Sequence, residues 1–325
     1  MTQDEQAQAL VGFGFTARQA GFLAAVMRHA GVCLARQYCA YAGIVRGQKT
    51  HDFFGTLVAR RYATAYSGGP RHARIYHVHH KRLYRAIGEP DARFRKPLAV
   101  ARAVERLMVL DHVLAHRDLI WLAGEREKVE YFGRTTSLRR EELPSLTFGR
   151  GTGKTTRYFA DKLPVGVSSD GRRHVFVYLV TQDVPLDFRA FLHRHAELLR
   201  ALTDWEVRLL IPRHLTASIA AYQEAFREEL AHPLRPAVVD ELVWYFRQLR
   251  PGPEPDGLRL REAQRAFAAP RYRALYRAWQ RDGDRVLHAT TSPILADSLA
   301  RRNGRLDCHV PTHRYLHLAP LVGTA

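Results

Sequence analysis

Three helical segments followed directly by a β-hairpin fill residues 15–88, and this order restricts the N-terminal part of the chain to a small helix-and-hairpin domain. The first helix begins at a capping box, in which Thr16 stands three residues before Gln19. Apolar residues then recur at helical spacing, at Phe22, Leu23, Val26 and Met27. The whole chain, with 325 residues, is long enough for two domains of ordinary size.

Two more helices and two strands complete the expected N-terminal domain. We predict a helix over Leu34–Ala42, a turn over Gly43–Gly47 and a third helix from about residue 48 to residue 61. The buried face of the third helix is expected to be Phe53, Phe54, Leu57 and Val58. Strands over 62–66 and 75–79 flank a turn at Ser67-Gly68-Gly69-Pro70, and the tip of this hairpin is basic.

This order of elements resembles the winged helix-turn-helix domain, a DNA-reading module. The resemblance implies that the third helix enters the major groove of duplex DNA and that the hairpin forms the wing. A three-helix bundle whose hairpin contacts another protein is the alternative interpretation. The two interpretations differ in whether the basic side chains of this domain contact phosphates.

The outward face of the third helix carries the candidate DNA-binding residues, because these side chains can hydrogen-bond to base edges or phosphates. They are Gln48, Lys49, Thr50, His51, Thr56 and Arg60. Three residues at the tip of the hairpin are expected to contact the minor groove or a flanking phosphate, namely Arg71, His72 and Arg74. A solvated basic turn is the alternative for the hairpin tip.

The charge of the chain favours a polyanionic partner. The 50 Lys and Arg residues exceed the 32 Asp and Glu residues and give a net charge of +18. The excess is densest at the N-terminal end, since residues 1–90 carry 12 basic and 4 acidic residues, a net +8. Arginine makes up 44 of the 50 basic residues, so a GC-rich genome is an alternative source of the excess.

The remaining sequence predicts an α+β fold in three parts, with boundaries at 1–90, 91–145 and 146–325. A Pro-bounded linker at 90–97 leads to a helical connector, whose helix over 98–114 is apolar on more than one face. This helix or the C-terminal domain is expected to mediate dimerisation. A second connector helix, 124–131, mixes acidic and basic residues as a solvated face does. The C-terminal α/β domain is expected to hold strands at 158–167, 175–180 and 205–211, with helices at 187–202 and 216–230. An amphipathic helix then begins at 237 and is followed by a Pro-rich loop at 251–255. Helical stretches up to residue 281, a helix at 292–302 and a closing strand over 306–318 complete the expected domain.

Several candidate chemical sites in the C-terminal part are weak. The stretch Gly149–Thr155 ends in Gly-Lys-Thr, but a nucleotide-binding loop needs glycine where Phe148 stands. The strands resemble those of restriction-endonuclease-like nucleases, with Asp161 and Lys162 placed on the first strand, but the second strand lacks the carboxylate and lysine of that family. The resemblance therefore implies a nuclease-like scaffold without cleavage.

Two histidine groups are expected to be structural rather than metal-binding. The first is His77, His79 and His80, and the second is Cys308, His309, His313 and His317. Pro311 argues against a helix at the second group, and on a strand its spacing spreads the ligands about 13 Å apart.

The layout over residues 15–230 is similar to the replication-relaxation family of bacterial mobile elements. That similarity and the basic N-terminal part lead us to expect a sequence-specific, homodimeric DNA-binding protein, a transcriptional regulator of a mobile element or defence locus, with no enzymatic activity and no cofactor. A metal-dependent nuclease or relaxase accessory protein, and a non-enzymatic adaptor in a nucleoprotein assembly, are the alternatives. The three cysteines, the acidic N-terminus and the absence of an 18-residue apolar window predict a cytoplasmic protein without a membrane span.

Overall fold

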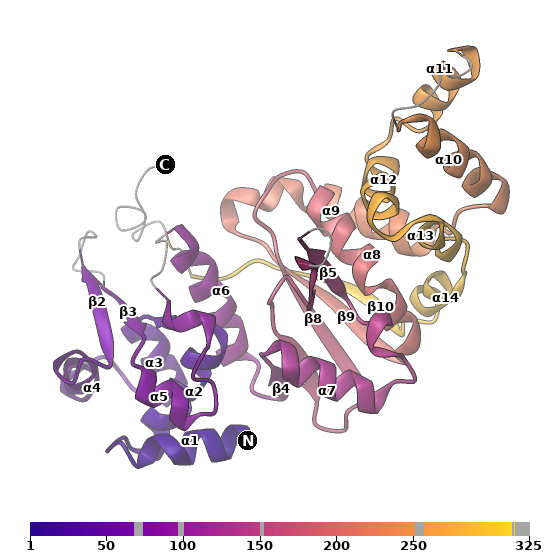
Figure 1. Cartoon of the computed structure of the whole chain (residues 1–325). Coiled ribbons are helices and arrows are strands. Elements are labelled where there is room, and N and C mark those ends of the chain that lie inside the picture. The colour runs from indigo at the N-terminus through magenta and orange to yellow at the C-terminus, as the bar shows by residue number, and fades with distance from the viewer. Residues whose placement is uncertain (68–73, 97–100, 150–152, 251–256, 314, 316–325) are drawn as a thin grey trace. The chain divides into compact units, whose positions relative to one another are not determined.

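A computed structural model describes residues 1–67, 74–96, 101–149, 153–250, 257–313 and 315 (Figure 1). It has a mixed α+β fold in two compact units. The first unit is Met1–Gly124 together with the described residues from Pro311 onward, and the second is Glu125–Val310. This division differs from the expected three parts. Residues of the expected linker and connector belong to the core of the first unit, as the burial of Phe94, Leu107 and Leu110 shows.

The first unit contains the three predicted helices and the predicted hairpin, and it adds elements that the sequence pattern did not indicate. The predicted elements are α2 (Ala17–His29), α3 (Ala35–Ala42), α4 (Gln48–Ala59), β2 (Ala63–Ser67), β3 (Arg74–Val78) and the described part of α6 (Ala101–Ala115). The additional elements are α1 (Gln3–Val11), β1 (Val32–Cys33), α5 (Lys81–Ala86) and β4 (Leu119–Leu122). The capping box at the start of α2 is confirmed, with reciprocal hydrogen bonds between Thr16 and Gln19.

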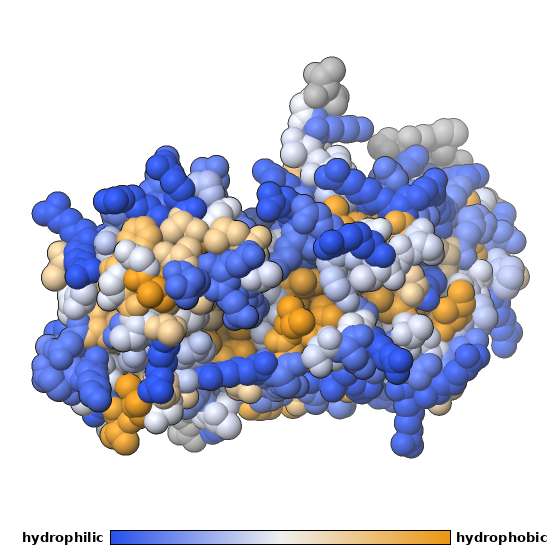
Figure 2. All heavy atoms as spheres, turned by 90° about the horizontal axis from the view of Figure 1, so that it is seen from below, coloured by the Kyte–Doolittle hydropathy of each residue, from blue (hydrophilic) through white to orange (hydrophobic). Residues whose placement is uncertain are grey.

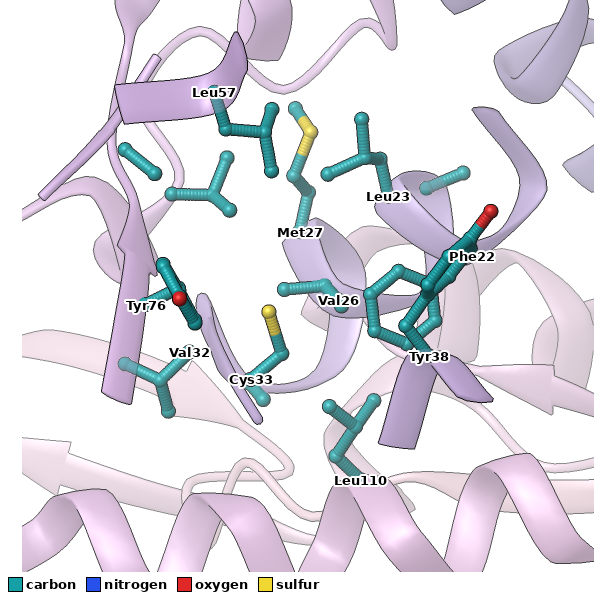
Figure 3. Close-up of a cluster of buried hydrophobic side chains, with 14 of the residues drawn as sticks. Phe22, Leu23, Val26, Met27, Val32, Cys33, Tyr38, Leu57, Tyr76 and Leu110 are labelled. Carbon is teal, nitrogen blue, oxygen red and sulfur yellow. The ribbon is translucent and has the colours of Figure 1, made fainter. Parts of the chain in front are cut away.

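The core of the first unit collects side chains from the helices α1 to α6 and from the strands β1 to β3. Figure 3 shows Val26 and Met27 of α2 pointing toward Cys33 of β1 and Leu57 of α4. Tyr76 of β3 lies on the other side of this group, with β1 between it and α2. The hairpin is thereby part of the core, because β1 and β2 both pair with β3 in the order β1-β3-β2.

The C-terminal segment returns to the first unit through a polar contact. The phenol of Tyr315 donates a hydrogen bond to Asp111 of α6. Asp111 also accepts two hydrogen bonds from the guanidinium of Arg36 on α3, at 2.8 and 2.7 Å. This bidentate pair connects α3, α6 and the end of the described chain.

The second unit is an α/β layer followed by a group of helices. Its elements are α7 (Glu125–Thr135), β5 (Ser145–Phe148), β6 (Thr155–Tyr158), β7 (Val165–Ser168), β8 (Arg173–Leu179), α8 (Leu186–Ala201), β9 (Asp204–Leu210), α9 (Ile219–Phe226), α10 (Pro236–Gln248), α11 (Gly257–Ala266), α12 (Pro270–Asp282), α13 (Asp284–Ala289), α14 (Ile294–Ala300) and β10 (Gly304–His309). Within this unit the strand order is β10-β9-β8-β7, with β8, β9 and β10 parallel and β7 antiparallel to β8.

Two expected strands of the second unit have other limits in the structure. The segment expected to form one strand over 158–167 is divided by a turn into β6 and β7, because Phe159 and Lys162 adopt left-handed backbone conformations with φ of 47° and 61°. The closing strand is confirmed only as β10, which ends at His309. The Pro-rich loop at 251–255 lies outside the described residues.

Helices α10 to α13 form a separate apolar cluster at one end of the second unit, coloured orange in Figure 1. Phe246, Leu275 and Trp279 are buried at its centre. Hydrophilic side chains cover most of the face of the molecule shown in Figure 2, and apolar residues are visible between them as separate patches. Among the helices of the described residues, none combines the length and apolar character that a membrane span requires.

Replacing Leu57 by alanine should destabilise the first unit, because the Leu57 side chain is fully buried between α4 and α2. We expect the free energy of unfolding to fall by about 2 to 5 kcal/mol, measured by urea denaturation. The matched control is Val58→Ala on the next position of α4, where 39% of the side chain is exposed. That change should cost no more than about 0.5 kcal/mol, and equal losses at the two positions would contradict the packing of α4.

Candidate nucleic-acid interface

The turn between α3 and α4 fixes the direction in which α4 leaves the domain. Gly43 ends α3 in the left-handed conformation, with φ of 62°, and the following amide of Ile44 donates to the carbonyl of Cys39 at 3.0 Å. Glycine adopts this conformation without the steric cost of a Cβ atom. Helix α4 then begins at Gln48, after Gly47 as its N-cap.

Aromatic packing determines which face of α4 points inward. The ring of Phe53 lies 4.5 Å from that of Tyr38 on α3, and Phe54 stacks on Tyr76 of β3 with the ring centroids 4.2 Å apart. Both phenylalanines are almost fully buried, as predicted. The opposite face of the helix is therefore left to solvent, or to a ligand.

Lys49 and His51 are the two candidate residues that this face presents most openly. Both side chains are exposed, on the first turn of α4. Neither makes a hydrogen bond or an ion pair with any residue that the structure describes. Their nitrogen atoms remain available to contact a base edge or a phosphate.

Other candidates on α4 already have intramolecular partners. The side-chain amide of Gln48 donates a hydrogen bond to the carboxylate of Asp52 at 2.6 Å. Asp52 is exposed and was not among the candidate residues. The Arg60 guanidinium donates to the carbonyl of Phe13 at 2.9 Å. Thr56 is half-buried. These three positions are less available to a ligand than Lys49 and His51.

Two expectations for α4 are wrong. Thr50 was expected to face outward, but only 2% of it is exposed and its hydroxyl lies 3.4 Å from the Cys39 sulfur. Val58 was expected to be buried, but it is 39% exposed. Both errors have one cause, because the buried face follows Thr50, Phe53, Phe54 and Leu57 and is rotated slightly from the predicted position.

The turn before α4 contributes two exposed residues that were not among the candidates. Val45 is 91% exposed, and Arg46 beside it is exposed as well. Both residues lie between Gly43 and Gly47 in the sequence, which predicts a turn there but does not predict which of its side chains are exposed. The structure places Val45 and Arg46 directly before the start of α4.

The hairpin presents one described candidate residue. Arg74 is exposed and pairs with Ser67 at the end of β3 nearest the hairpin turn. Arg71 and His72 lie outside the described residues. In the same strand His77 is buried, and a ring nitrogen lies 2.8 Å from the Phe94 carbonyl. Burial lowers the pKa of His77, consistent with a structural role for this histidine.

An open hollow of about 770 Å³ adjoins the turn that follows α3. It is lined by Arg18 from the start of α2, by Tyr41 and Gly43, and by Arg117. The Arg117 guanidinium lies over the Tyr41 ring at 4.0 Å. Arg18 is exposed. Like Arg46, it is a basic residue close to this turn that was not among the candidates.

In the second unit, Asp161 lies in a turn and not on a strand, contrary to expectation. One of its carboxylate oxygens is 3.6 Å from Nε2 of His195 on α8. Lys128 of α7 was expected on a solvated face, but it is 1% exposed and donates a hydrogen bond to the Leu163 carbonyl. The described residues contain no group of three or more His, Cys, Asp or Glu side chains suited to a metal ion.

His195 should make the stability of the second unit depend on pH. Burial lowers the pKa of His195 to about 4, although the nearby Asp161 carboxylate opposes this shift. Below the unfolded value of about 6.5, the unfolded chain binds a proton that the folded chain does not. The free energy of unfolding should therefore fall as the pH decreases from about 6.5 to about 4, by up to about 1.4 kcal/mol per pH unit from this group.

Urea denaturation of His195→Gln across this pH range checks the effect. Its pH slope should be smaller than that of the wild type by about one proton. The exposed His288→Gln variant is the control and should keep the wild-type slope. An unchanged slope in His195→Gln would contradict the burial of a neutral His195.

The candidate interface is identified from the residues of this chain alone. No family model, curated protein or solved structure matches the sequence.

Proposed function

We propose that this chain is a sequence-specific DNA-binding protein of the winged helix-turn-helix type and acts as a transcriptional regulator. The observation that carries the proposal is the exposed first turn of α4, where Lys49 and His51 have no partner among the described residues. The order α2, α3, α4, β2, β3 agrees with this type of domain, in which the third helix of the module is the one that enters the major groove.

Base reading is assigned to the start of α4. A lysine ammonium can donate to the O6 and N7 atoms of guanine, and a histidine nitrogen can hydrogen-bond to a base edge. Val45, just before the helix, offers an apolar contact suited to the methyl group of thymine. Lys49, His51 and Val45 together can therefore distinguish neighbouring base pairs.

Positioning on the DNA backbone is assigned to the arginines around this helix. Arg46 precedes α4, Arg74 lies at the hairpin, and Arg18 lines the hollow beside the α3 turn. Phosphate contacts of this kind fix the orientation of a domain without reading sequence. The net charge of +8 over residues 1–90 supports the same assignment.

A homodimer remains part of the proposal, because two copies double the length of the recognised site. Two surfaces are expected for it, the helix α6 and the C-terminal domain. On α6, Leu107 and Leu110 are buried in the core of the first unit, so these two side chains are not available to a second copy.

Replacing Lys49 by alanine should weaken specific binding more than non-specific binding. If Lys49 reads a guanine, the loss on the preferred site should exceed the loss on random duplex by about 1 to 3 kcal/mol. Fluorescence anisotropy on the two duplexes measures the difference. Lys154→Ala is the matched control, because Lys154 is an exposed lysine of the second unit, and it should leave this ratio unchanged.

Arg74→Ala tests the positioning role in the same assay. It should weaken binding to both duplexes equally and lower the slope of log affinity against log salt by about 1. If Lys49→Ala also lost affinity equally on both duplexes, α4 would not read sequence, and the adaptor interpretation would replace the proposal.

A further inference from the structure

Helices α11 and α12 of the second unit are the most arginine-rich part of its surface. Over residues 257–282 the chain has seven arginines, at 259, 261, 265, 271, 273, 277 and 281, and two acidic residues, Glu262 and Asp282. Arg271 is buried and donates to the His232 carbonyl at 2.7 Å, so it has a structural role. The others are exposed, but Arg281 is paired with Asp282 at 2.6 Å and the Arg259 guanidinium lies over the Trp244 ring at 3.8 Å. Arg261, Arg265, Arg273 and Arg277 remain.

The packing of each helix turns two of these arginines outward together. On α12 the buried residues are Ala274, Leu275, Ala278 and Trp279, and the exposed Arg273 and Arg277 lie on the opposite side, one helical turn apart. On α11 the buried residue is Ala263, and Arg261 and Arg265 are exposed at the same spacing. We call these four residues the arginine face.

No acidic residue in the described part of the chain neutralises the arginine face. Arg273 donates to the Ala268 carbonyl at 3.5 Å, and the ion pairs of the described residues include none of the four. Like charges four residues apart on a helix destabilise it by about 0.2 to 0.5 kcal/mol per pair. Two such unfavourable pairs on neighbouring helices indicate a use other than stability.

Four exposed arginines elsewhere in the second unit differ from the arginine face, because each of them is paired with a carboxylate. Arg126 lies 3.5 Å from Glu130, and Arg227 lies 2.9 Å from Glu224. Arg139 and Arg157 have the same kind of partner, in Glu142 at 3.1 Å and Glu125 at 3.8 Å. On α12 itself Arg281 is paired with Asp282 at 2.6 Å, whereas the four residues of the arginine face have no ion pair among the described residues.

We propose that the arginine face is a second DNA-binding surface, which contacts the sugar-phosphate backbone of duplex DNA without reading sequence. Guanidinium groups suit phosphate oxygens because they present several donors in a fixed plane. The outward side of α12, with Arg273, Arg277 and Gln280, lacks the apolar centre that protein interfaces use. The choice of duplex DNA as the polyanion rests on the proposed function.

The experiment compares the salt dependence of duplex binding by the full chain and two fourfold variants. Each phosphate contact contributes about 0.9 to the slope of log affinity against log salt. The variant R261Q/R265Q/R273Q/R277Q should therefore lower the slope by up to about 3.6 on any duplex sequence. The control R126Q/R139Q/R157Q/R227Q removes the same charge from ion-paired arginines and should leave the slope unchanged.

Thermal melting confirms that both variants fold, and the pairs R261Q/R265Q and R273Q/R277Q should each produce part of the loss. Equal slopes for the face variant and the wild type, while Lys49→Ala loses specific binding, would overturn this inference and keep the proposed function. A loss confined to the face variant, with Lys49→Ala unaffected, would keep the inference and overturn the proposed function. Equal changes in both fourfold variants, a stronger effect on RNA than on DNA, or no duplex binding by the wild type would overturn the inference.

Discussion

The burial of one face of α4 is the interaction on which the architecture of the first unit depends. Phe53 and Phe54 pack against the rings of Tyr38 and Tyr76, and Leu57 fills the space beside α2. Aromatic and aliphatic burial of this kind contributes several kcal/mol and fixes a helix in rotation as well as in place. This fixed rotation exposes Lys49 and His51 at the start of α4. The proposed DNA-reading residues therefore lie on the side of α4 opposite its buried face.

Buried charges of the second unit are paired, whereas the arginine face on its surface is not. Burial raises the pKa of Glu206, but hydrogen bonds and charge from Arg173 and Arg208 outweigh burial and hold the pKa below its usual value. Buried carboxylates of this kind need such partners to remain ionised. The four arginines of the arginine face have no carboxylate partner among the described residues, and this contrast supports our assignment of that surface to a polyanion.

Periodicity and capping predicted the elements that local sequence determines. The capping box at Thr16, the glycine that ends α3 and the aromatic stripe of α4 each specify their element through neighbouring residues. The missed elements depend on distant partners. The two residues of β1 form a strand only because they pair with His77 and Tyr76. The rotation of α4 that buries Thr50 depends on the packing of Phe53 and Phe54 against Tyr38 and Tyr76.

The domain boundary could not be predicted because Pro90 and Pro97 marked a linker, whereas burial of Phe94 places that segment in the core of the first unit.

For the candidate site, residue types identified Lys49 and His51, but the exposure of Val45 and Arg46 required the structure. Selection of bound sites from random duplex DNA with the full chain shows most directly whether this protein reads sequence. We predict enrichment of a short common sequence, arranged as an inverted repeat if two copies bind together. Retention of DNA without any enriched sequence would contradict sequence-specific binding.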